Sequence, residues 1–185
     1  MINRRFFFDQ ARTFLFNGKL KQSQVDGLTH ILDEWEDAYA KKDDRWLAYM
    51  LATAHHETDR AMQPVEEYGK GKNRAYGKPD PDTGLVYYGR GFVQLTWKSN
   101  YEAMGDKLDV DLVGHPELAL ELDVASRIMF RGMIDGTFTG RKLARYFSPS
   151  KEDWVNARRI INGSDKANLI AGYAKQYYAA ISYTT

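Results

Sequence analysis

Apolar residues recur three and four positions apart along most of this chain, which is the spacing of helices that bury one face. The first such run covers residues 3–16, where phenylalanines and a leucine alternate with charged residues until Asn17-Gly18 ends it. The next helix is expected to begin at Ser23, because Ser23 and Asp26 resemble a capping box with Asp in place of the usual Glu.

A third helix is expected to begin at Asp43 or Asp44, either of which can cap its first turn. Glu57 lies near the end of this helix, and its carboxylate is expected on or beside the apolar face. Burial at a helix C-terminus, whose partial charge is negative, raises the pKa of a carboxylate. Glu57 is therefore a candidate general acid at neutral pH. The apolar stripe beside it consists of Leu47, Met50, Leu51, Ala54 and Ala61.

Helical periodicity stops between residues 62 and 84, where glycines and prolines punctuate a polar segment. Loops of this length inside a compact domain are commonly functional, and this one holds Glu66 and Glu67. The stretch Tyr87–Trp97 follows and is expected to be a short strand or extended segment. A helix is expected over residues 98–107.

The second half of the chain is expected to be helical as well. The expected segments are a helix from Pro116 to near Gly132, a short helix stopped by Pro149, a helix capped by Ser150 and Asp153 that runs to Asn162-Gly163, and a last helix over 165–182. The pattern predicts a mainly α fold with a small extended element. We expect one catalytic domain over residues 1–185, in which residues 1–44 form a helical N-terminal part packed on the rest.

Composition and charge exclude several classes of site. The absence of cysteine excludes disulfides, thiolate metal sites and a cysteine nucleophile. Lysines and arginines total 26 against 25 acidic residues, so the net charge of +1 gives no reason to expect nucleic-acid binding. The basic pairs Arg4-Arg5 and Arg158-Arg159 are interpreted as solvated helix faces.

No stretch of the sequence is long and apolar enough to be a transmembrane helix, so no stable membrane insertion is expected. The apolar start of the chain resembles a signal peptide, but Asp9 and Arg12 break the run before it reaches a useful length. We therefore expect a protein made in the cytoplasm.

The stretch Tyr87–Trp97 has a composition unlike that of an ordinary core strand. Gly89 and Gly91 allow the backbone to approach another surface closely or to take positive φ. The tyrosine, glutamine, threonine and tryptophan side chains offer hydrogen bonds and flat faces, which suit sugars. From these residues alone, the stretch is either a sugar-binding surface or a glycine-kinked strand.

Two patterns around Glu57 concern its chemistry. His55-His56-Glu57-Thr58 resembles part of a zinc-peptidase motif, but Arg60 occupies the position of the second histidine, so neither a metal nor another cofactor is expected. Glu57 and Glu66 are separated by a helix end, which allows the loop to set the distance between them. Two carboxylates in unlike environments are the minimum apparatus for glycoside hydrolysis, one as acid and one as base.

Three motifs together resemble glycoside hydrolase family 19, which comprises plant-type chitinases and a branch of bacteriophage endolysins. They are Ala54-His55-His56-Glu57-Thr58, the stretch Tyr87–Trp97 followed by Asn100-Tyr101, and Ile160-Ile161-Asn162-Gly163. Several motifs in the right order are far more specific than any one of them. The resemblance implies an α+β, lysozyme-like fold in which the small extended element lies beside an active-site cleft.

The resemblance also implies roles for individual residues. Glu57 is the general acid, and Glu66 is the base that activates a water in an inverting reaction, with Glu67 as the alternative base. Inversion requires a gap of roughly 6.5–9.5 Å between the two carboxyl groups. Arg90 is expected to hold the acidic residues through charge-assisted hydrogen bonds. The water-positioning hydroxyl falls on Thr96, and the substrate-binding positions fall on Tyr88, Arg90, Gln94, Asn100 and Asn162.

Departures from the family pattern direct the functional hypothesis. Asp59-Arg60 replaces the Gly-Gly that commonly follows the acid, and the segment after Glu66 differs from that of the plant enzymes. The leading hypothesis is a monomeric phage or prophage endolysin that cuts the β-1,4 bonds of peptidoglycan after a separate permeabilising protein releases it from the host cytoplasm. The alternatives are a bacterial chitinase that acts on GlcNAc polymers, a non-catalytic glycan-binding module, and a structural protein of a phage particle.

Overall fold

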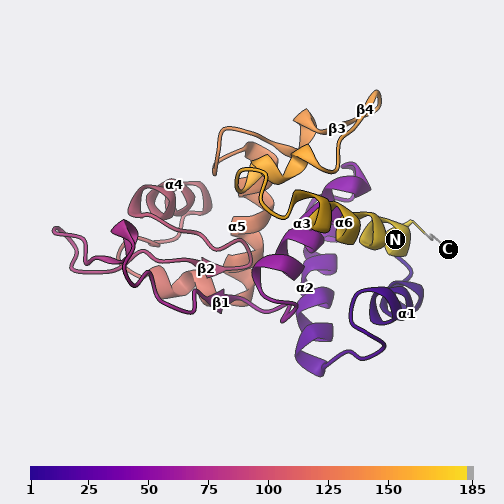
Figure 1. Cartoon of the computed structure of the whole chain (residues 1–185), viewed down its shortest axis with the longest axis horizontal. Coiled ribbons are helices and arrows are strands. Elements are labelled where there is room, and N and C mark those ends of the chain that lie inside the picture. Colours follow the sequence, from indigo (N-terminus) through magenta and orange to yellow (C-terminus); the bar gives the residue numbers. More distant parts are fainter. Residues whose placement is uncertain (183–185) are drawn as a thin grey trace.

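The helix that ends at Glu57 lies in the middle of the molecule, and other helices pack around it (Figure 1). The structure is a computed structural model in which residues 1–182 are described. The α-helices in that range are α1 (Arg4–Phe14), α2 (Gln22–Ala38), α3 (Asp44–Glu57), α4 (Lys98–Leu108), α5 (Leu122–Asp135) and α6 (Ala167–Ile181). Short 3-10 helices are η1 (Ala75–Gly77), η2 (Pro116–Leu120), η3 (Leu143–Arg145) and η4 (Asn156–Ile160). The predicted mainly helical fold is confirmed.

Two short antiparallel strand pairs interrupt the helices. They are β1 (Val65–Glu66) with β2 (Arg90–Gly91), and β3 (Phe147–Ser148) with β4 (Lys151–Glu152). In the first pair, Glu66 lies opposite Arg90, and a further bridge joins Arg90 to Leu95. The extended element expected over Tyr87–Trp97 is therefore confirmed, and it pairs with the strand that carries Glu66.

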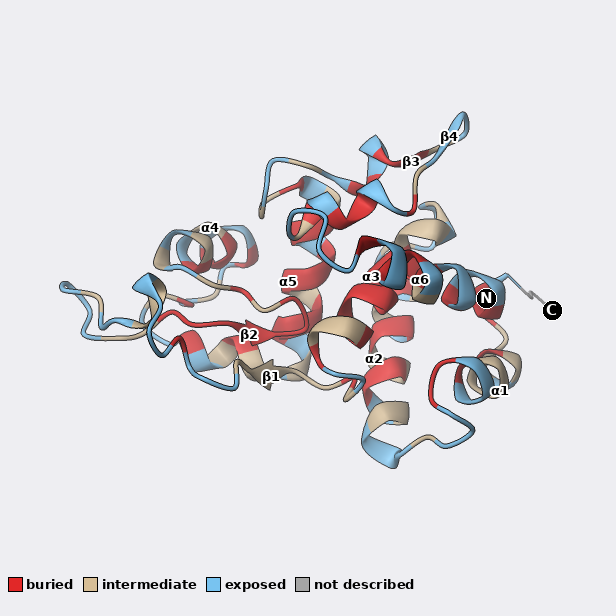
Figure 2. Ribbon diagram, in the orientation of Figure 1, coloured by how far each residue is buried: buried red, intermediate tan, exposed pale blue. Residues whose placement is uncertain are grey.

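The core around α3 fixes the position of Glu57. The helix is buried without interruption from Leu47 to His55, and α3 and α5 form the buried centre in Figure 2. α6 packs along α3, and α1 packs on α6. Tyr177 of α6 is fully buried, shares a hydrogen bond with His55 Nδ1 at 3.1 Å and stacks on Phe7 of α1. A helix held on this many sides gives its last residue little freedom.

The N-terminal helices belong to the same core. Side chains of α1 and α2 lie in one continuous cluster of buried residues with those of α3, α5 and α6. At Gly27, α2 comes so close to the chain after α3 that an added Cβ would lie 1.7 Å from the carbonyl oxygen of Met62. Only a glycine allows that approach, so α2 supports the segment between Glu57 and β1 directly.

Several expected helix ends differ from those in the structure. α2 begins at Gln22, one residue before the expected start, because the Gln24 side chain accepts from the Lys21 N–H at 2.8 Å and replaces the expected Ser23 cap. Asp43 caps α3 by accepting from the Arg45 N–H, as expected. α3 ends at Glu57, so Ala61 does not belong to its inward stripe.

The second half also contains less α-helix than its pattern predicts. Pro116 begins the 3-10 helix η2 rather than α5, which starts six residues later at Leu122. The short helix expected before Pro149 is the 3-10 helix η3, and Ser150 lies in the turn between β3 and β4 rather than at a helix cap. Asp153 does cap a helical segment, since its side chain accepts from the Asn156 N–H at the start of η4. Within residues 1–182, no helix has the length and apolarity that crossing a bilayer requires.

Candidate active site

Glu57 is held at the end of α3 by an arginine from a distant part of the chain. Arg158 Nη1 donates to Glu57 Oε1 at 2.6 Å, and the side chains are 4% and 16% exposed respectively. Arg158 lies on η4, and its Nε also donates to the carbonyl oxygen of Asp165 at 3.2 Å. The interpretation of Arg158 as part of a solvated face is therefore wrong. The Arg158 guanidinium therefore fixes the Glu57 carboxylate at the end of α3.

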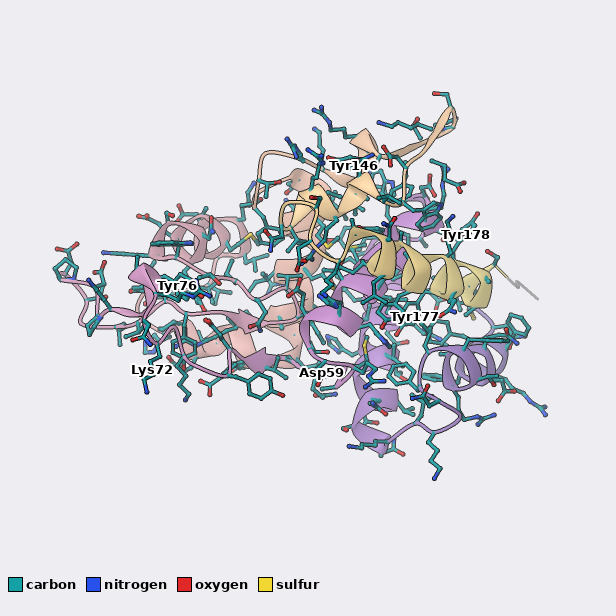
Figure 3. The ribbon with its side chains drawn as sticks, in the orientation of Figure 1. Asp59, Lys72, Tyr76, Tyr146, Tyr177 and Tyr178 are labelled. Carbon is teal, nitrogen blue, oxygen red and sulfur yellow. The ribbon has the colours of Figure 1, made fainter. Side chains whose placement is uncertain are left out.

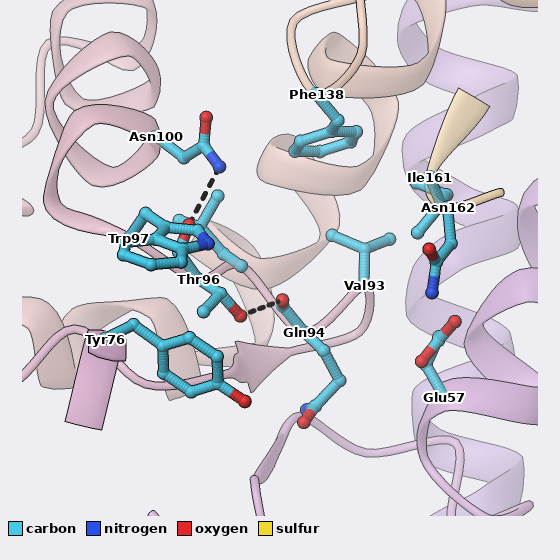
Figure 4. A pocket seen from close by; sticks show the side chains of 11 residues that line it. Glu57, Tyr76, Val93, Gln94, Thr96, Trp97, Asn100, Phe138, Ile161 and Asn162 are labelled. Atoms are coloured by element: carbon cyan, nitrogen blue, oxygen red, sulfur yellow. Dashed lines mark hydrogen bonds between the residues drawn. The ribbon is translucent and has the colours of Figure 1, made fainter. Parts of the chain in front are cut away.

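Glu57 opens onto a cleft formed by two adjoining pockets, which share Glu57 and Gln94. The larger pocket has a volume of about 490 Å³ and is shown in Figure 4. It is lined by Glu57, Tyr76, Val93, Gln94, Leu95, Thr96, Trp97, Asn100, Phe138, Ile161 and Asn162. The smaller pocket, of about 370 Å³, is lined by Glu57, Thr58, Asp59, Val65, Glu66, Glu67, Tyr68, Gly69 and Gln94. Space for a polymer thus exists on both sides of Glu57.

Glu66 faces the smaller pocket from β1. The Tyr88 hydroxyl donates to its Oε1, and Lys70 Nζ lies 2.9 Å from its Oε2. The hydrogen bond from Tyr88, followed by that from Lys70, lowers the pKa of Glu66 below its usual value. A carboxylate that stays ionised and reaches the cleft can act as a base toward water.

Glu67, the alternative base, also has a partner on each of its two carboxylate oxygens. Its Oε1 accepts from the Tyr76 hydroxyl at 2.9 Å, and its Oε2 accepts from the Gly89 N–H at 3.2 Å. These bonds tie the loop after β1 to the stretch Tyr87–Trp97. Both glutamates line the smaller pocket, and the Glu66 side chain is 36% exposed.

Arg90 makes no hydrogen bond to either glutamate, which corrects the expectation for this residue. It is buried, and its Nη1 donates to the Tyr101 hydroxyl at 2.9 Å and to the carbonyl of Val86 at 3.1 Å. Its guanidinium lies 3.6 Å from the centre of the Tyr88 ring. Arg90 therefore orients Tyr88, and Tyr88 in turn bonds to Glu66. Neither Arg90 nor Tyr88 lines the larger or the smaller pocket.

The polar residues of the stretch Tyr87–Trp97 form a chain of hydrogen bonds. Gln94 Nε2 donates to the carbonyl of Val65 at 3.1 Å, Thr96 Oγ1 donates to the carbonyl of Gln94 at 2.8 Å, and Asn100 Nδ2 donates to the carbonyl of Thr96 at 2.8 Å. Gln94 takes a left-handed conformation with φ of 53°, which turns the chain between β2 and α4. Thr96 and Asn100 both line the larger pocket, and each side chain keeps an oxygen that can accept a hydrogen bond.

The predicted site residues do not all meet at one point. Thr96 and Asn100 line the larger pocket with Glu57, whereas Glu66 lines the smaller one. Asn162 is exposed, its Oδ1 accepts from the Gly163 N–H, and its amide nitrogen points toward Glu57 in Figure 4. The role of Thr96 in holding the water for Glu66 stays a prediction.

An aromatic wall of the larger pocket was not predicted from the sequence. Trp97, whose flat face was expected to suit sugars, is 49% exposed and packs edge-to-face against Tyr76 with ring centres 5.3 Å apart. Phe138 lines the opposite side of the same pocket (Figure 4). The rings are separated along the sequence, so no local pattern marks them as one surface. Exposed aromatic faces beside polar acceptors are suited to the flat faces of sugar rings.

Metal chemistry receives no support from the described residues, among which no group of three or more His, Cys, Asp and Glu side chains could hold an ion. His55, the first histidine before Glu57, is buried between aromatic rings and bonded to Tyr177. Burial lowers its pKa to about 4, so it stays neutral at physiological pH. Figure 3 shows the labelled side chains of Tyr177 and Tyr178 on α6 beside this region.

A family model described as "Chitinase class I", that of glycoside hydrolase family 19, matches residues 37–139. The chain belongs to glycoside hydrolase family 19. The match contains Glu57, Glu66 and the stretch Tyr87–Trp97, whereas Arg158 and Asn162 lie beyond it. An acidic endochitinase of Petunia hybrida is 30% identical over 129 residues, which cover 68% of this chain and 46% of that protein.

Solved structures of the family support the fold. Chitinase C from Streptomyces griseus HUT6037 superimposes with a TM-score of 0.61 at 21% identity, covering 100% of this chain and 78% of that one. A family 19, class IV chitinase from Zea mays gives a TM-score of 0.59 at 18% identity, covering 95% and 92%. The expected lysozyme-like helical fold is confirmed. The chain spans less than half the length of the petunia relative, so the activity of that relative is not transferred on this basis.

Proposed function

We propose that this family 19 protein is a peptidoglycan-degrading endolysin that hydrolyses β-1,4 glycosidic bonds of the cell-wall glycan with inversion. The observation that carries the proposal is the arrangement of two carboxylates in one cleft. Glu57 is 16% exposed and fixed by Arg158, while Glu66 is 36% exposed and kept ionised by Tyr88. Unlike environments for two carboxylates are what separate acid and base roles require.

In the proposed reaction, Glu57 donates a proton to the glycosidic oxygen as the bond from that oxygen to the anomeric carbon breaks. Glu66 removes a proton from a water, whose oxygen attacks the anomeric carbon from the opposite face. Since Arg158 occupies Oε1 of Glu57, the transferred proton is carried on Oε2. Glu57 ends ionised beside a guanidinium, which stabilises the state of the acid after proton transfer.

The larger and the smaller pocket supply the sugar subsites. Thr96, Asn100 and Asn162 offer amide and hydroxyl groups on the side of the larger pocket, together with the exposed ring of Trp97. Gln94 borders both pockets and is placed to contact the sugars on either side of the scissile bond.

The acid assignment is tested with purified cell walls, whose loss of turbidity is followed for the wild type and for Glu57→Gln. The substitution keeps the size and the acceptor for Arg158 but removes the transferable proton, and the rate is expected to fall on the order of 10²–10⁴-fold. Glu102→Gln, at an exposed position on α4, is the matched control. Equal clearing by the wild type and Glu57→Gln would sink the assignment, and NMR of the released reducing ends checks inversion of the anomeric carbon.

A chitinase acting on GlcNAc polymers is the second candidate, because the relatives of this chain include an acidic endochitinase and several chitinases. Chitin oligomers assayed beside peptidoglycan separate the two functions. Hydrolysis of chitin oligomers without hydrolysis of cell walls would favour this candidate. For the endolysin, we further propose synthesis in the host cytoplasm, release by a separate permeabilising protein and action as a monomer.

A further inference from the structure

A further pocket adjoins the smaller pocket and is lined in part by residues 16–24. It has a volume of about 490 Å³ and shares Asp59 with the smaller pocket, two residues after the proposed acid. We call it the basic pocket; its lining consists of Phe16, Asn17, Lys19, Leu20, Lys21, Gln24, Asp59 and Arg60. The basic pocket and the smaller pocket therefore adjoin at Asp59.

The basic pocket is built where two separate segments of the chain meet. One wall is the connection from α1 to α2, and the other is the turn that follows α3. Gln24 joins them, because its Nε2 donates to the carbonyl of Arg60 at 2.8 Å while its Oε1 accepts from the Lys21 N–H. The first wall precedes the span that the family model matches.

The turn after α3 has an unusual backbone. Asp59 and Arg60 take left-handed conformations with φ of 45° and 66°, in place of the two glycines expected from the family pattern. Left-handed backbone costs energy for residues with a side chain, so the side chains gained here carry a conformational cost. In return, the turn presents Asp59 toward the smaller pocket and Arg60 toward the basic pocket. Asp59 is labelled in Figure 3.

The charges of the two neighbouring pockets are opposite in sign. Lys19, Lys21 and Arg60 are exposed, and none of them forms an ion pair within residues 1–182. Asp59 is the one acidic residue among the lining residues of the basic pocket, whereas the smaller pocket contains four acidic residues. Unpaired cations around a hollow attract an anion and leave it partly solvated. Phe16 and Leu20 add an apolar floor between these cations.

We propose that the basic pocket binds carboxylate groups of the peptide stems that branch from peptidoglycan strands. This inference rests on the proposed function and names the feature of the substrate that a neutral GlcNAc polymer lacks. A peptide stem carries free carboxylates, which can pair with the lysines and the arginine. It also carries alkyl side chains, which can pack on the apolar floor. Its attachment to a sugar ring held in the smaller pocket brings it next to Asp59, at the entrance of the basic pocket.

The test compares Lys19→Glu/Lys21→Glu with Lys41→Glu/Lys175→Glu, which changes the charge equally at exposed positions outside the pocket. Three substrates are used: intact peptidoglycan, glycan strands freed of stems by an amidase, and chitin oligomers. For the basic-pocket variant, the ratio of KM on intact to KM on stem-free strands is expected to rise on the order of tenfold, with kcat affected far less. The control variant is expected to keep the wild-type ratio.

A second readout does not depend on hydrolysis. Both charge variants are placed in the Glu57→Gln background, and cosedimentation with walls is measured with and without peptide stems at low and high salt. We expect the parent and the control variant to bind walls in a way that depends on the peptide stems and weakens with salt. The basic-pocket variant is expected to lose this stem-dependent binding. An unchanged ratio together with unchanged cosedimentation overturns the inference, as does equal loss on stem-free strands. Failure of the wild type to hydrolyse any peptidoglycan would instead refute the proposed function, while the binding readout still tests the pocket.

Discussion

Removing the Tyr88 hydroxyl tests which glutamate is the base. In the structure this hydroxyl donates to Oε1 of Glu66, and it is the largest cause of the lowered pKa of that carboxyl. Tyr88→Phe keeps the ring that stacks on Arg90, so the packing around the buried guanidinium is preserved. The substitution therefore changes one hydrogen bond to the proposed base and little else.

The size of the effect follows from the strength of that bond. A hydrogen bond to a charged group contributes roughly 1.5–3 kcal/mol, and water replaces part of it where the acceptor is accessible. Since the Glu66 side chain is 36% exposed, water replaces part of the bond, and its loss costs about half of the lower figure, or ~0.7–1 kcal/mol. Loss of this contribution raises the pKa of Glu66, and about 1.36 kcal/mol corresponds to one pH unit. A base must be ionised to act, so the acidic limb of kcat/KM moves to higher pH.

The assay is the pH profile of kcat/KM for the wild type, Tyr88→Phe and Tyr76→Phe. Tyr76 donates to Glu67 as Tyr88 donates to Glu66, so the two substitutions are matched probes of the two candidate bases. A shift of the acidic limb in Tyr88→Phe but not in Tyr76→Phe supports Glu66. The reverse result would refute the reasoning and assign Glu67. Tyr87→Phe, whose hydroxyl bonds to Val113 and Thr83, controls for loss of a neighbouring hydroxyl.

The remaining predictions concern the support of the acid. Arg158→Ala leaves the Glu57 carboxylate without its cation and is expected to lower the free energy of unfolding by about 3–5 kcal/mol. Arg158→Lys is expected to restore part of this loss, and Arg159→Ala, at an exposed position, is expected to change the stability little. Thermal denaturation of the three variants measures these differences. In Arg158→Lys, a folded protein with unaltered kcat would contradict the role given to the guanidinium. Gly27→Ala is expected to destabilise by about 1–3 kcal/mol through its clash with the Met62 carbonyl, whereas Gly172→Ala, with open space around it on α6, is expected to stabilise by about 0.5–1 kcal/mol. Equal stabilities of these two alanine variants would show that α2 does not need its close approach.

The parts of the fold that follow from local spacing were predictable. The apolar stripe of α3 and its Asp43 cap gave the helix and placed Glu57 beside the core. The two glycines of Tyr87–Trp97 marked an extended segment, and Gly91 does take positive φ, at 84°. Such features depend on residues within one or two turns of each other, and one sequence is enough to reveal them.

Contacts between distant segments were not predictable in the same way. Arg158 bonds to Glu57 across 101 positions, and nothing near Arg158 distinguishes it from its exposed neighbour Arg159. The local pattern around Pro116 also could not separate a 3-10 turn from the first turn of α5, because both bury residues at similar spacing. Arg90 was expected to bond to the acidic residues, but its guanidinium lies over the Tyr88 ring and donates to Tyr101, a contact that no local pattern reveals.

Glu57 and Glu66 differ in how rigidly the fold holds them, and this difference affects how the distance between the two carboxylates is set. Glu57 ends a helix buried from Leu47 to His55, so its position is set by the core. Glu66 lies on a two-residue strand, and the chain between them turns through three non-glycine residues of positive φ, Asp59, Arg60 and Met62. Gln94 holds this strand through its bond to the Val65 carbonyl while bordering both pockets. Gln94, which is proposed to bind sugar, therefore also ties the strand that carries Glu66 to the stretch Tyr87–Trp97. A sugar that hydrogen-bonds to the Gln94 amide then affects the distance between Glu57 and Glu66.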